Sequence, residues 1–215
     1  MKIRRAIISV SEKTGLIPLA KELQRFKVEI FSTGGTLALL KRHKIAVCSI
    51  AALTGFPEIL EGRVKTLHPN VHGGLLFLRS SKTQRREAKE HGIFPIDMVV
   101  VNLYPFRETI RTPGVSLKEA VEQIDIGGPS MLRSAAKNFE SVAVVSDPKD
   151  YPAVIEELKK NKGSLSTEFR KSLALKAFQH TAAYDREIAR YLSSVSFPHA
   201  LSGNLDPRLQ HSGMT

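Results

Sequence analysis

The chain has 215 residues, with 32 Lys and Arg against 21 Asp and Glu, giving a formal net charge of +11. Its 42% hydrophobic and 25% charged content and mean hydropathy of −0.13 exclude a disordered chain. No apolar run approaches the roughly 20 residues of a membrane span, and the charged start does not resemble a secretory leader. The single cysteine, Cys48, excludes an internal disulfide and a cysteine-based zinc cage. We therefore expect a cytoplasmic protein without a metal.

The basic excess is concentrated near the start of the chain, where residues 1–50 hold ten basic and three acidic side chains. Such a bias favours an anionic ligand, because basic surface raises the local concentration of anions. Nucleic acid is the alternative, but the chain has no Trp and only four Tyr, and aromatic and basic residues are not interleaved as in base-stacking proteins. A small anion is the better prediction.

The first 50 residues predict alternating strands and helices. Apolar runs predict strands at Ala6–Val10, Val28–Phe31 and Ala46–Cys48, and helical periodicity predicts helices over Leu16–Phe26 and from Leu37 to about His43. Short connections between such elements indicate a parallel sheet with right-handed crossovers.

The middle of the chain is less regular. Two prolines and several glycines predict a long functional loop over Thr54–Gly74, followed by a short strand at Leu75–Leu78 and a charged helix at Lys82–His91. The β-branched run Met98–Val101 predicts a strand buried on both faces.

The last third is mostly helical. We expect an amphipathic segment at Val115–Ile124, a helix at Pro129–Asn138, a strand at Val142–Val145, and helices at Val154–Lys160 and Thr167–Leu192. The prediction is an α/β fold with an open, mostly parallel sheet to about residue 147, a helical extension to 195, and a tail or linker over residues 196–215.

Two hydroxyl-rich segments lie at the C-terminal ends of the first two predicted strands. Ser9, Ser11 and Lys13 occupy the end of the first strand, and the run Ser32–Thr36, with glycines at positions 34 and 35, follows the second. Ligands of open α/β sheets bind at such strand ends, and free amides at a helix N-terminus attract phosphate. Ordinary capped turns are the alternative. No nucleotide-hydrolysing P-loop sequence is present.

Two further segments carry candidate catalytic groups. Arg63 and Lys65 lie in a glycine- and proline-bounded loop that could hold an anion or be an ordinary charged surface loop, and Pro69 between His68 and His72 argues against a metal-binding helix. Asp125 precedes a Gly-Gly turn with free amides, so Asp125 and Lys137 could act as base and partner. The alternative is a helix-terminal carboxylate and a surface lysine.

Four long motifs, STGGT, TGFPEILEGRVKTLHPNVHGG, VVVNLYPF and IDIGGPSMLRSAAKN, occur in the order found in one family. Over residues 4–193 the chain resembles the inosine monophosphate (IMP) cyclohydrolase domain of the bifunctional purine-biosynthesis protein. The resemblance implies a methylglyoxal-synthase-like fold and a cyclic amidine hydrolase that closes 5-formamidoimidazole-4-carboxamide ribotide (FAICAR) to IMP with loss of water, without a cofactor. It also implies a homodimer, and no transformylase activity in this chain.

The same resemblance implies roles for individual residues. The catalytic positions would be Lys65, Tyr104, Asp125 and Lys137. The substrate would be held by the two turns, the basic loop, the ring-facing Asn102 and the amides around the Gly-Gly turn: Ser9, Ser11, Lys13, Ser32, Thr33, Gly34, Gly35, Thr36, Arg63, Thr66, Asn102, Ile126, Gly127 and Gly128. Alternatives on the same fold are a methylglyoxal-synthase-like lyase and a non-catalytic phosphometabolite sensor.

Overall fold

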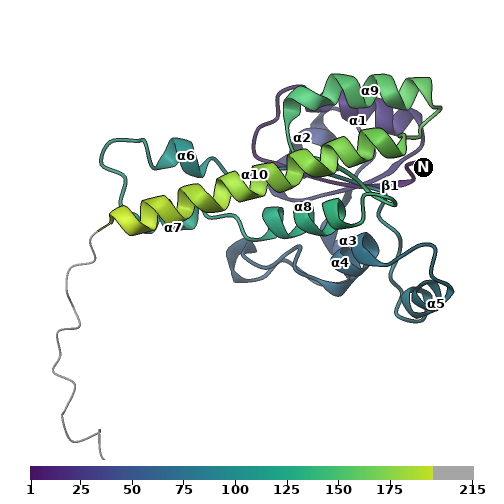
Figure 1. Cartoon of the computed structure of the whole chain (residues 1–215), viewed down its shortest axis with the longest axis horizontal. Coiled ribbons are helices and arrows are strands. Elements are labelled where there is room, and N and C mark those ends of the chain that lie inside the picture. Colours follow the sequence, from purple (N-terminus) through teal and green to yellow (C-terminus); the bar gives the residue numbers. More distant parts are fainter. Residues whose placement is uncertain (196–215) are drawn as a thin grey trace, which may run out of the picture.

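The computed structural model describes residues 1–195 as a five-stranded parallel sheet with helices on both faces (Figure 1). The strand order is β3-β2-β1-β4-β5, and every neighbouring pair is parallel. The strands are β1 (Arg5–Val10), β2 (Glu29–Ser32), β3 (Cys48–Ser49), β4 (Met98–Asn102) and β5 (Ala143–Val145). The predicted α/β fold class is confirmed.

The two central strands have the apolar sequences of a sheet that is covered on both faces. Ile7, Ile8, Val99 and Val100 are fully buried. The register places Val10 of β1 beside Asn102 of β4, so that polar residues at the ends of both strands emerge at one edge. After β1 the chain continues to β2 on one side of the sheet, and after β4 it continues to β5 on the other side. The carboxyl ends of β1 and β4 are therefore the switch point, where ligands bind in open α/β sheets.

Helices complete both layers of the fold. On one face lie α1 (Leu16–Arg25), α2 (Gly34–Arg42) and α9 (Tyr151–Lys160); on the other, α4 (Pro69–Leu76), α8 (Gly127–Lys137) and the long α10 (Thr167–Ser194) (Figure 1). The remaining helices are short or peripheral: α3 (Ile50–Thr54), α5 (Lys82–Glu90), α6 (Phe106–Thr109), α7 (Leu117–Glu122), and the 3₁₀ turns Leu60–Gly62 and Pro148–Asp150. The predicted C-terminal helices are present, and α10 packs on β5 and α8.

The middle of the chain differs from its prediction. The strand predicted at Leu75–Leu78 is wrong, because Leu75 and Leu76 end α4 and the next two residues form a connection. The predicted long loop contains most of α4, since Pro69 occupies the first helical position, where its missing N–H costs nothing. The third strand lies slightly later than predicted, at Cys48–Ser49.

Two other expectations concern the limits of the fold. The tail predicted for residues 196–215 lies outside the described residues. Across residues 1–195, no helix combines the length and the apolar character that crossing a membrane requires.

Candidate active site

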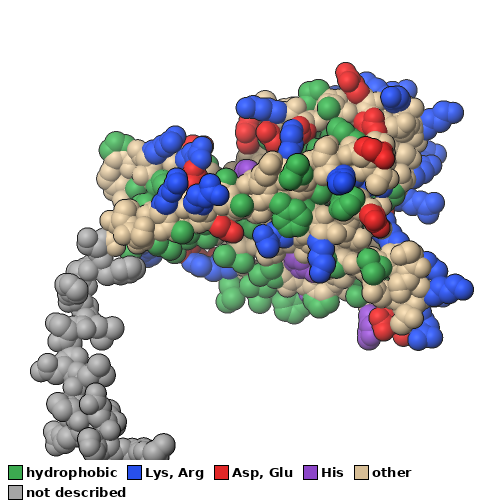
Figure 2. Space-filling view, viewed as in Figure 1, with side chains coloured by type: hydrophobic (Ala, Val, Ile, Leu, Met, Phe, Trp, Pro, Cys, Tyr) green, Lys and Arg blue, Asp and Glu red, His purple; other side chains and the backbone are tan. Residues whose placement is uncertain are grey.

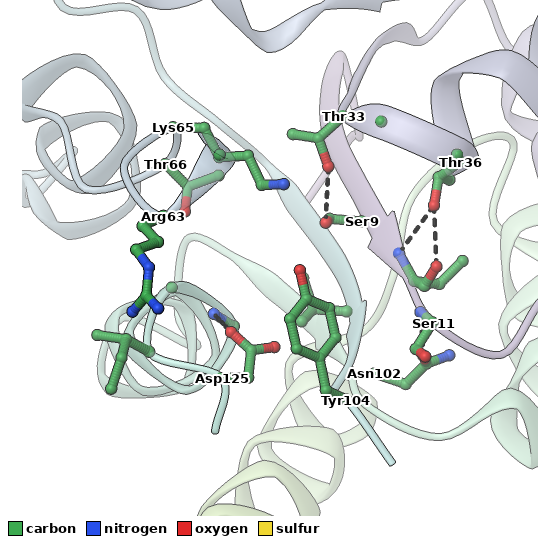
Figure 3. A pocket seen from close by; sticks show the side chains of 18 of the residues that line it. Ser9, Ser11, Thr33, Thr36, Arg63, Lys65, Thr66, Asn102, Tyr104 and Asp125 are labelled. Atoms are coloured by element: carbon green, nitrogen blue, oxygen red, sulfur yellow. Dashed lines mark hydrogen bonds between the residues drawn. The ribbon is translucent and has the colours of Figure 1, made fainter. Parts of the chain in front are cut away.

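A cavity of about 460 Å³ opens at the carboxyl ends of β1, β2 and β4. Five separate segments surround it: the β1–α1 loop, the β2–α2 turn, the loop around residues 61–66, the end of β4, and the segment from α7 to the start of α8 (Figure 3). Sixteen of the predicted site residues line this cavity: Ser9, Ser11, Lys13, Thr33, Gly34, Gly35, Thr36, Arg63, Lys65, Thr66, Asn102, Tyr104, Asp125, Ile126, Gly127 and Gly128.

One wall, which we call the hydroxyl side, consists of Ser9, Thr33 and Thr36. The Ser9 and Thr33 hydroxyl oxygens lie 3.0 Å apart and share a hydrogen bond across the β1–β2 edge. Thr36 accepts the Val10 N–H at 3.2 Å and donates to the Val10 carbonyl at 2.9 Å, which joins α2 to the end of β1. Thr36 is therefore a structural brace as well as part of the cavity wall.

The backbone of the hydroxyl side is open to a ligand. Gly34 has a φ of +43°, a conformation that glycine adopts without strain, and no other atom lies within 4 Å of where its Cβ would be. This turn begins α2, whose first amides have no partner within the helix. An anion placed here would meet backbone N–H groups at the positive end of the helix dipole.

Asn102 supports the β1–α1 loop. Its Oδ1 accepts the amide protons of Ser11 and Glu12 at 2.6 and 2.9 Å, and its Nδ2 donates to the Glu12 carbonyl at 2.9 Å. Lys13 is held to the same loop, because its Nζ donates to the Ser11 carbonyl at 3.0 Å. The sequence analysis expected Asn102 to face a substrate ring. In the structure, both polar atoms of its side-chain amide already bind backbone.

The opposite wall, which we call the charged side, consists of Lys65, Tyr104 and Asp125, all directed into the cavity (Figure 3). Burial raises the pKa of Asp125 above its usual range, although the Gly128 and Tyr104 amides and the Lys65 charge act in the opposite direction. The Gly128 N–H donates to Asp125 Oδ1 at 2.8 Å. A desolvated carboxylate with an adjacent lysine is the arrangement that proton transfer requires.

The two glycines at the start of α8 allow this wall to pack closely. A Cβ on Gly128 would lie 2.4 Å from Asp125 Oδ2 and 2.8 Å from Leu103, and a Cβ on Gly127 would lie 2.5 Å from the Thr66 hydroxyl. Only glycine lets α8 approach both Asp125 and the 61–66 loop. The sequence predicted free amides at this turn, but the Gly128 amide is not free, because it donates to Asp125. Within residues 1–195, no protein acceptor is found for the Ile126 and Gly127 amides.

Arg63 lies at the rim of the cavity and forms an ion pair with Glu122 of α7. Both side chains are largely exposed, so solvent screens the pair and its contribution to stability is small. The pair connects the 61–66 loop to α7, and Lys65 of the same loop points into the cavity (Figure 3).

Two predicted site residues do not reach the cavity. Ser32 is fully buried and donates to the Ile8 carbonyl at 2.7 Å, so it joins β2 to β1 and does not face a ligand. Lys137 is exposed at the far end of α8, ten residues from Gly127, which at 1.5 Å per residue is about 15 Å along the helix. The predicted Asp125–Lys137 pair is therefore not formed within one chain.

Tyr184 is a supporting residue that sequence analysis missed. Its hydroxyl accepts the Asp125 N–H at 2.8 Å and donates to the Gln123 carbonyl at 3.1 Å, so α10 fixes the backbone that carries the carboxylate. Burial raises the pKa of Tyr184 to about 12. The sequence predicted the helix over Thr167–Leu192 that carries Tyr184, but helical periodicity could not indicate the partner across the fold.

His72 is a second supporting residue outside the cavity. It lies on α4, and its Nδ1 is 3.0 Å from the Ser134 hydroxyl of α8, which links the two helices beneath the site. His68 caps α4 by accepting the Asn70 N–H at 3.1 Å. In the part of the chain that the structure describes, no three His, Cys, Asp or Glu side chains form a group that could hold a metal.

The fold and the cavity define a class: an α/β domain whose parallel sheet presents hydroxyls, cations and the half-buried carboxylate of Asp125 at its switch point. The chain belongs to the MGS-like domain family, whose model matches residues 15–130. The model of the AICARFT/IMPCHase bienzyme matches residues 135–212.

Individual relatives agree with this assignment. The bifunctional purine biosynthesis protein PurH of Anoxybacillus flavithermus is 58% identical over 89% of this chain and 37% of its own length. PurH of Bacillus subtilis is 54% identical over 91% of this chain and 38% of its own length. The chain thus spans about two fifths of the length of these relatives. The crystal structure of ForH is 41% identical with a TM-score of 0.81, and the match covers 88% of this chain and 97% of that one.

Proposed function

We propose that this chain is an IMP cyclohydrolase, which closes FAICAR to IMP with loss of water in purine biosynthesis. The observation that carries the proposal is one cavity that combines an open, hydroxyl-lined helix N-terminus with Lys65, Tyr104 and Asp125 on the facing wall. Such a pairing of an anion cradle and acid–base groups suits a phosphorylated substrate that needs proton transfer. The relatives named PurH support the same pathway.

In this proposal the ribotide phosphate binds the β2–α2 turn, with Lys13 and the Ser11 loop beside it. The imidazole ring then extends toward Lys65 and Asp125 across the cavity. Because ring closure joins two groups of one molecule, the first contribution of the protein is to select the conformer in which carboxamide nitrogen and formyl carbon meet. The braces formed by Thr36 and Asn102 keep this cradle rigid.

The chemical step requires a base and a stabilised oxygen. The carboxamide nitrogen is a poor nucleophile, so Asp125 accepts its proton as the nitrogen attacks the formyl carbon. Lys65 and the amides of Ile126 and Gly127 stabilise the formyl oxygen as it becomes anionic, and Tyr104 lies beside it. The oxygen receives one proton through Asp125 and a second from the formamide nitrogen, and it leaves as water when its C–O bond breaks. The electron pair of that nitrogen then forms the carbon–nitrogen double bond of the new ring. The raised pKa of Asp125 makes it a stronger base than an exposed aspartate.

The direct test is to mix the purified chain with FAICAR and to follow IMP formation by ultraviolet absorbance. We expect turnover without added metal or folate, and a large loss of kcat with little change in KM for Lys65→Ala. A protein that binds IMP without turning FAICAR over would instead be the phosphometabolite sensor. Formation of methylglyoxal from dihydroxyacetone phosphate would identify the lyase.

Cytoplasmic location and a homodimer, both expected from the sequence, are part of the same proposal. Sedimentation of the purified chain over a range of concentrations measures the second. A mass that stays at one chain at all concentrations would remove the dimer from the proposal.

A further inference from the structure

A second cavity, of about 840 Å³, lies at the amino ends of β1 and β4, at the edge of the sheet opposite the candidate active site. Its walls come from the start of the chain, the α4–α5 connection, helix α5, and the segment that leads into β4. Figure 2 shows Lys and Arg side chains gathered along this edge, beside the N-terminus and over α5. No role in the proposed reaction involves this cavity.

Cations greatly outnumber anions around this cavity. Six basic residues line it, namely Lys2, Arg4, Arg5, Arg79, Arg85 and Lys89, and the only acidic residue of its lining is Asp97. Asp97 is 4% exposed and is already engaged, because it accepts the Arg4 and Arg5 amides at 2.8 and 2.9 Å and pairs with Arg79. The other five basic side chains therefore have no acidic partner within the lining.

Three of the cations are available to a ligand. Arg5 is paired with Glu29 outside the cavity, and Arg79 with Asp97. Arg85 donates to the Arg79 carbonyl. Within residues 1–195, Lys2, Arg4 and Lys89 form neither an ion pair nor a side-chain hydrogen bond, and they approach the cavity from two different segments. Like charges held together in a hollow repel one another, and a bound anion relieves that repulsion.

The cavity also has an aromatic surface. The Phe94 ring is 57% exposed, and the Arg5 guanidinium lies 5.1 Å from its centre. The Arg79 guanidinium lies 5.7 Å from the Phe77 ring, and Ile93 and Pro95 extend the apolar lining. Exposed aromatic rings and planar guanidinium groups both stack against flat ligands.

We propose that this cavity is a second binding site, which takes a nucleotide: a phosphate toward Lys2, Arg4 and Lys89, and a flat base against Phe94 and its neighbours. The volume lies within the usual 300–1,000 Å³ of small-molecule sites. A polynucleotide fits less well, because the free cations meet around one hollow and do not line a groove. The proposal concerns binding and holds whether or not the active site performs the proposed reaction.

AMP and inorganic phosphate serve as probes, and amide hydrogen exchange of the full chain reports where each one binds. We expect AMP to protect amides of α5 and of residues 92–97, separately from any protection at residues 9–13, 33–36 and 125–128. Arg4→Ala/Lys89→Ala should weaken the first protection at least tenfold while FAICAR turnover, if present, stays unchanged. The matched variant Lys21→Ala/Lys171→Ala removes the same charge from exposed sites that line neither cavity.

The variant Phe94→Ala distinguishes the contact with the base from the contact with the phosphate. This variant should weaken AMP binding at the second cavity but leave inorganic phosphate binding as it was. Equal affinity for AMP and phosphate would overturn the nucleotide assignment, because the base would then make no contact. Absence of protection in α5 and residues 92–97, or equal weakening by the Lys21/Lys171 control, would overturn the site itself.

Discussion

The two walls of the candidate active site are built in different ways. On the hydroxyl side, Ser9 lies near the end of β1, and Thr33 and Thr36 lie at the start of α2, directly after β2. Their hydroxyl groups bind one another or neighbouring backbone. On the charged side, Lys65, Tyr104 and Asp125 come from three distant segments, and α8 and α10 hold Asp125 in place. The comparison teaches that the cradle is a local feature of strand ends, whereas the reactive groups depend on tertiary packing.

The largest expected effect comes from the carboxylate of the charged side. Asp125→Asn keeps an oxygen for the Gly128 amide but loses the base, so kcat should fall about 10²- to 10⁴-fold, with KM changed far less. Initial rates with FAICAR measure both constants. Asp185→Asn, at an exposed position of α10, is the matched control and should be active. Near-normal turnover of Asp125→Asn would remove Asp125 from the mechanism.

Replacing a glycine by alanine on each wall compares how closely the two walls are packed. Gly128→Ala should lower the free energy of unfolding by about 1–3 kcal/mol and displace Asp125, because the new Cβ would overlap Asp125 and Leu103. Gly35→Ala meets no atom within 4 Å and should not lower stability. Urea unfolding of both variants without ligand makes the comparison. Equal stability of the two would mean that α8 adjusts freely.

Thr36→Val tests the rigidity of the hydroxyl side. Valine has the same shape but no hydroxyl, so the Val10 N–H loses its partner in a buried setting, at a cost of about 1–3 kcal/mol. The weakened cradle should appear as a higher KM with kcat nearly intact. Thr36→Ser restores the hydroxyl and should recover both stability and KM. If the valine variant bound substrate normally, the brace would be unimportant for the cradle.

Tyr184→Phe tests how far the charged side depends on α10. The loss of two hydrogen bonds to the backbone around Asp125 should cost about 1–2 kcal/mol of stability. The effect on kinetics should be a several-fold fall in kcat, since the carboxylate is held less firmly, and little change in phosphate affinity. Stability measured by denaturant and kinetics with FAICAR test the two parts independently. A selective rise in KM would contradict this division.

The smallest effect concerns pH and His72, which links α4 to α8. Burial lowers the pKa of His72 below 6.5 in the folded protein, so the unfolded chain takes up a proton first as pH falls. Stability from this group is therefore complete above pH 6.5 and declines as pH falls toward the lower folded value. His72→Asn should reduce the loss of stability between pH 7 and 5. Burial also lowers the pKa of His180, but this residue is present in both proteins. Identical pH profiles would therefore show that His72 does not contribute.

Sequence patterns predicted the fold correctly where the residues of a segment determine its secondary structure without distant partners. The β-branched run Met98–Val101 and the Leu16, Leu19, Leu23 periodicity gave β4 and α1 correctly. The apolar run Leu75–Leu78 did not become a strand, because Pro69 begins a helix that ends within it and packs on α8. Short apolar runs carry no information about such distant neighbours.

The same distinction holds for the site. The positions of Ser9 and Thr33 at strand ends were enough to predict that they lie together, and both line the cavity. The role of Asn102 as a brace, the burial of Ser32 and the contact of Tyr184 with Asp125 all depend on partners far away in the chain. Lys137 is the opposite case. It is close to Asp125 in sequence, but helix α8 places the two residues far apart.

The register at the centre of the sheet has a consequence for biosynthesis. Ala6 pairs with Met98, so the two central strands cannot join until the ribosome has released the first hundred residues. Tyr184 then reaches the Asp125 backbone only after most of α10 has emerged. On a growing chain the hydroxyl side is therefore assembled early, and the charged side is secured only after most of α10 has been synthesised.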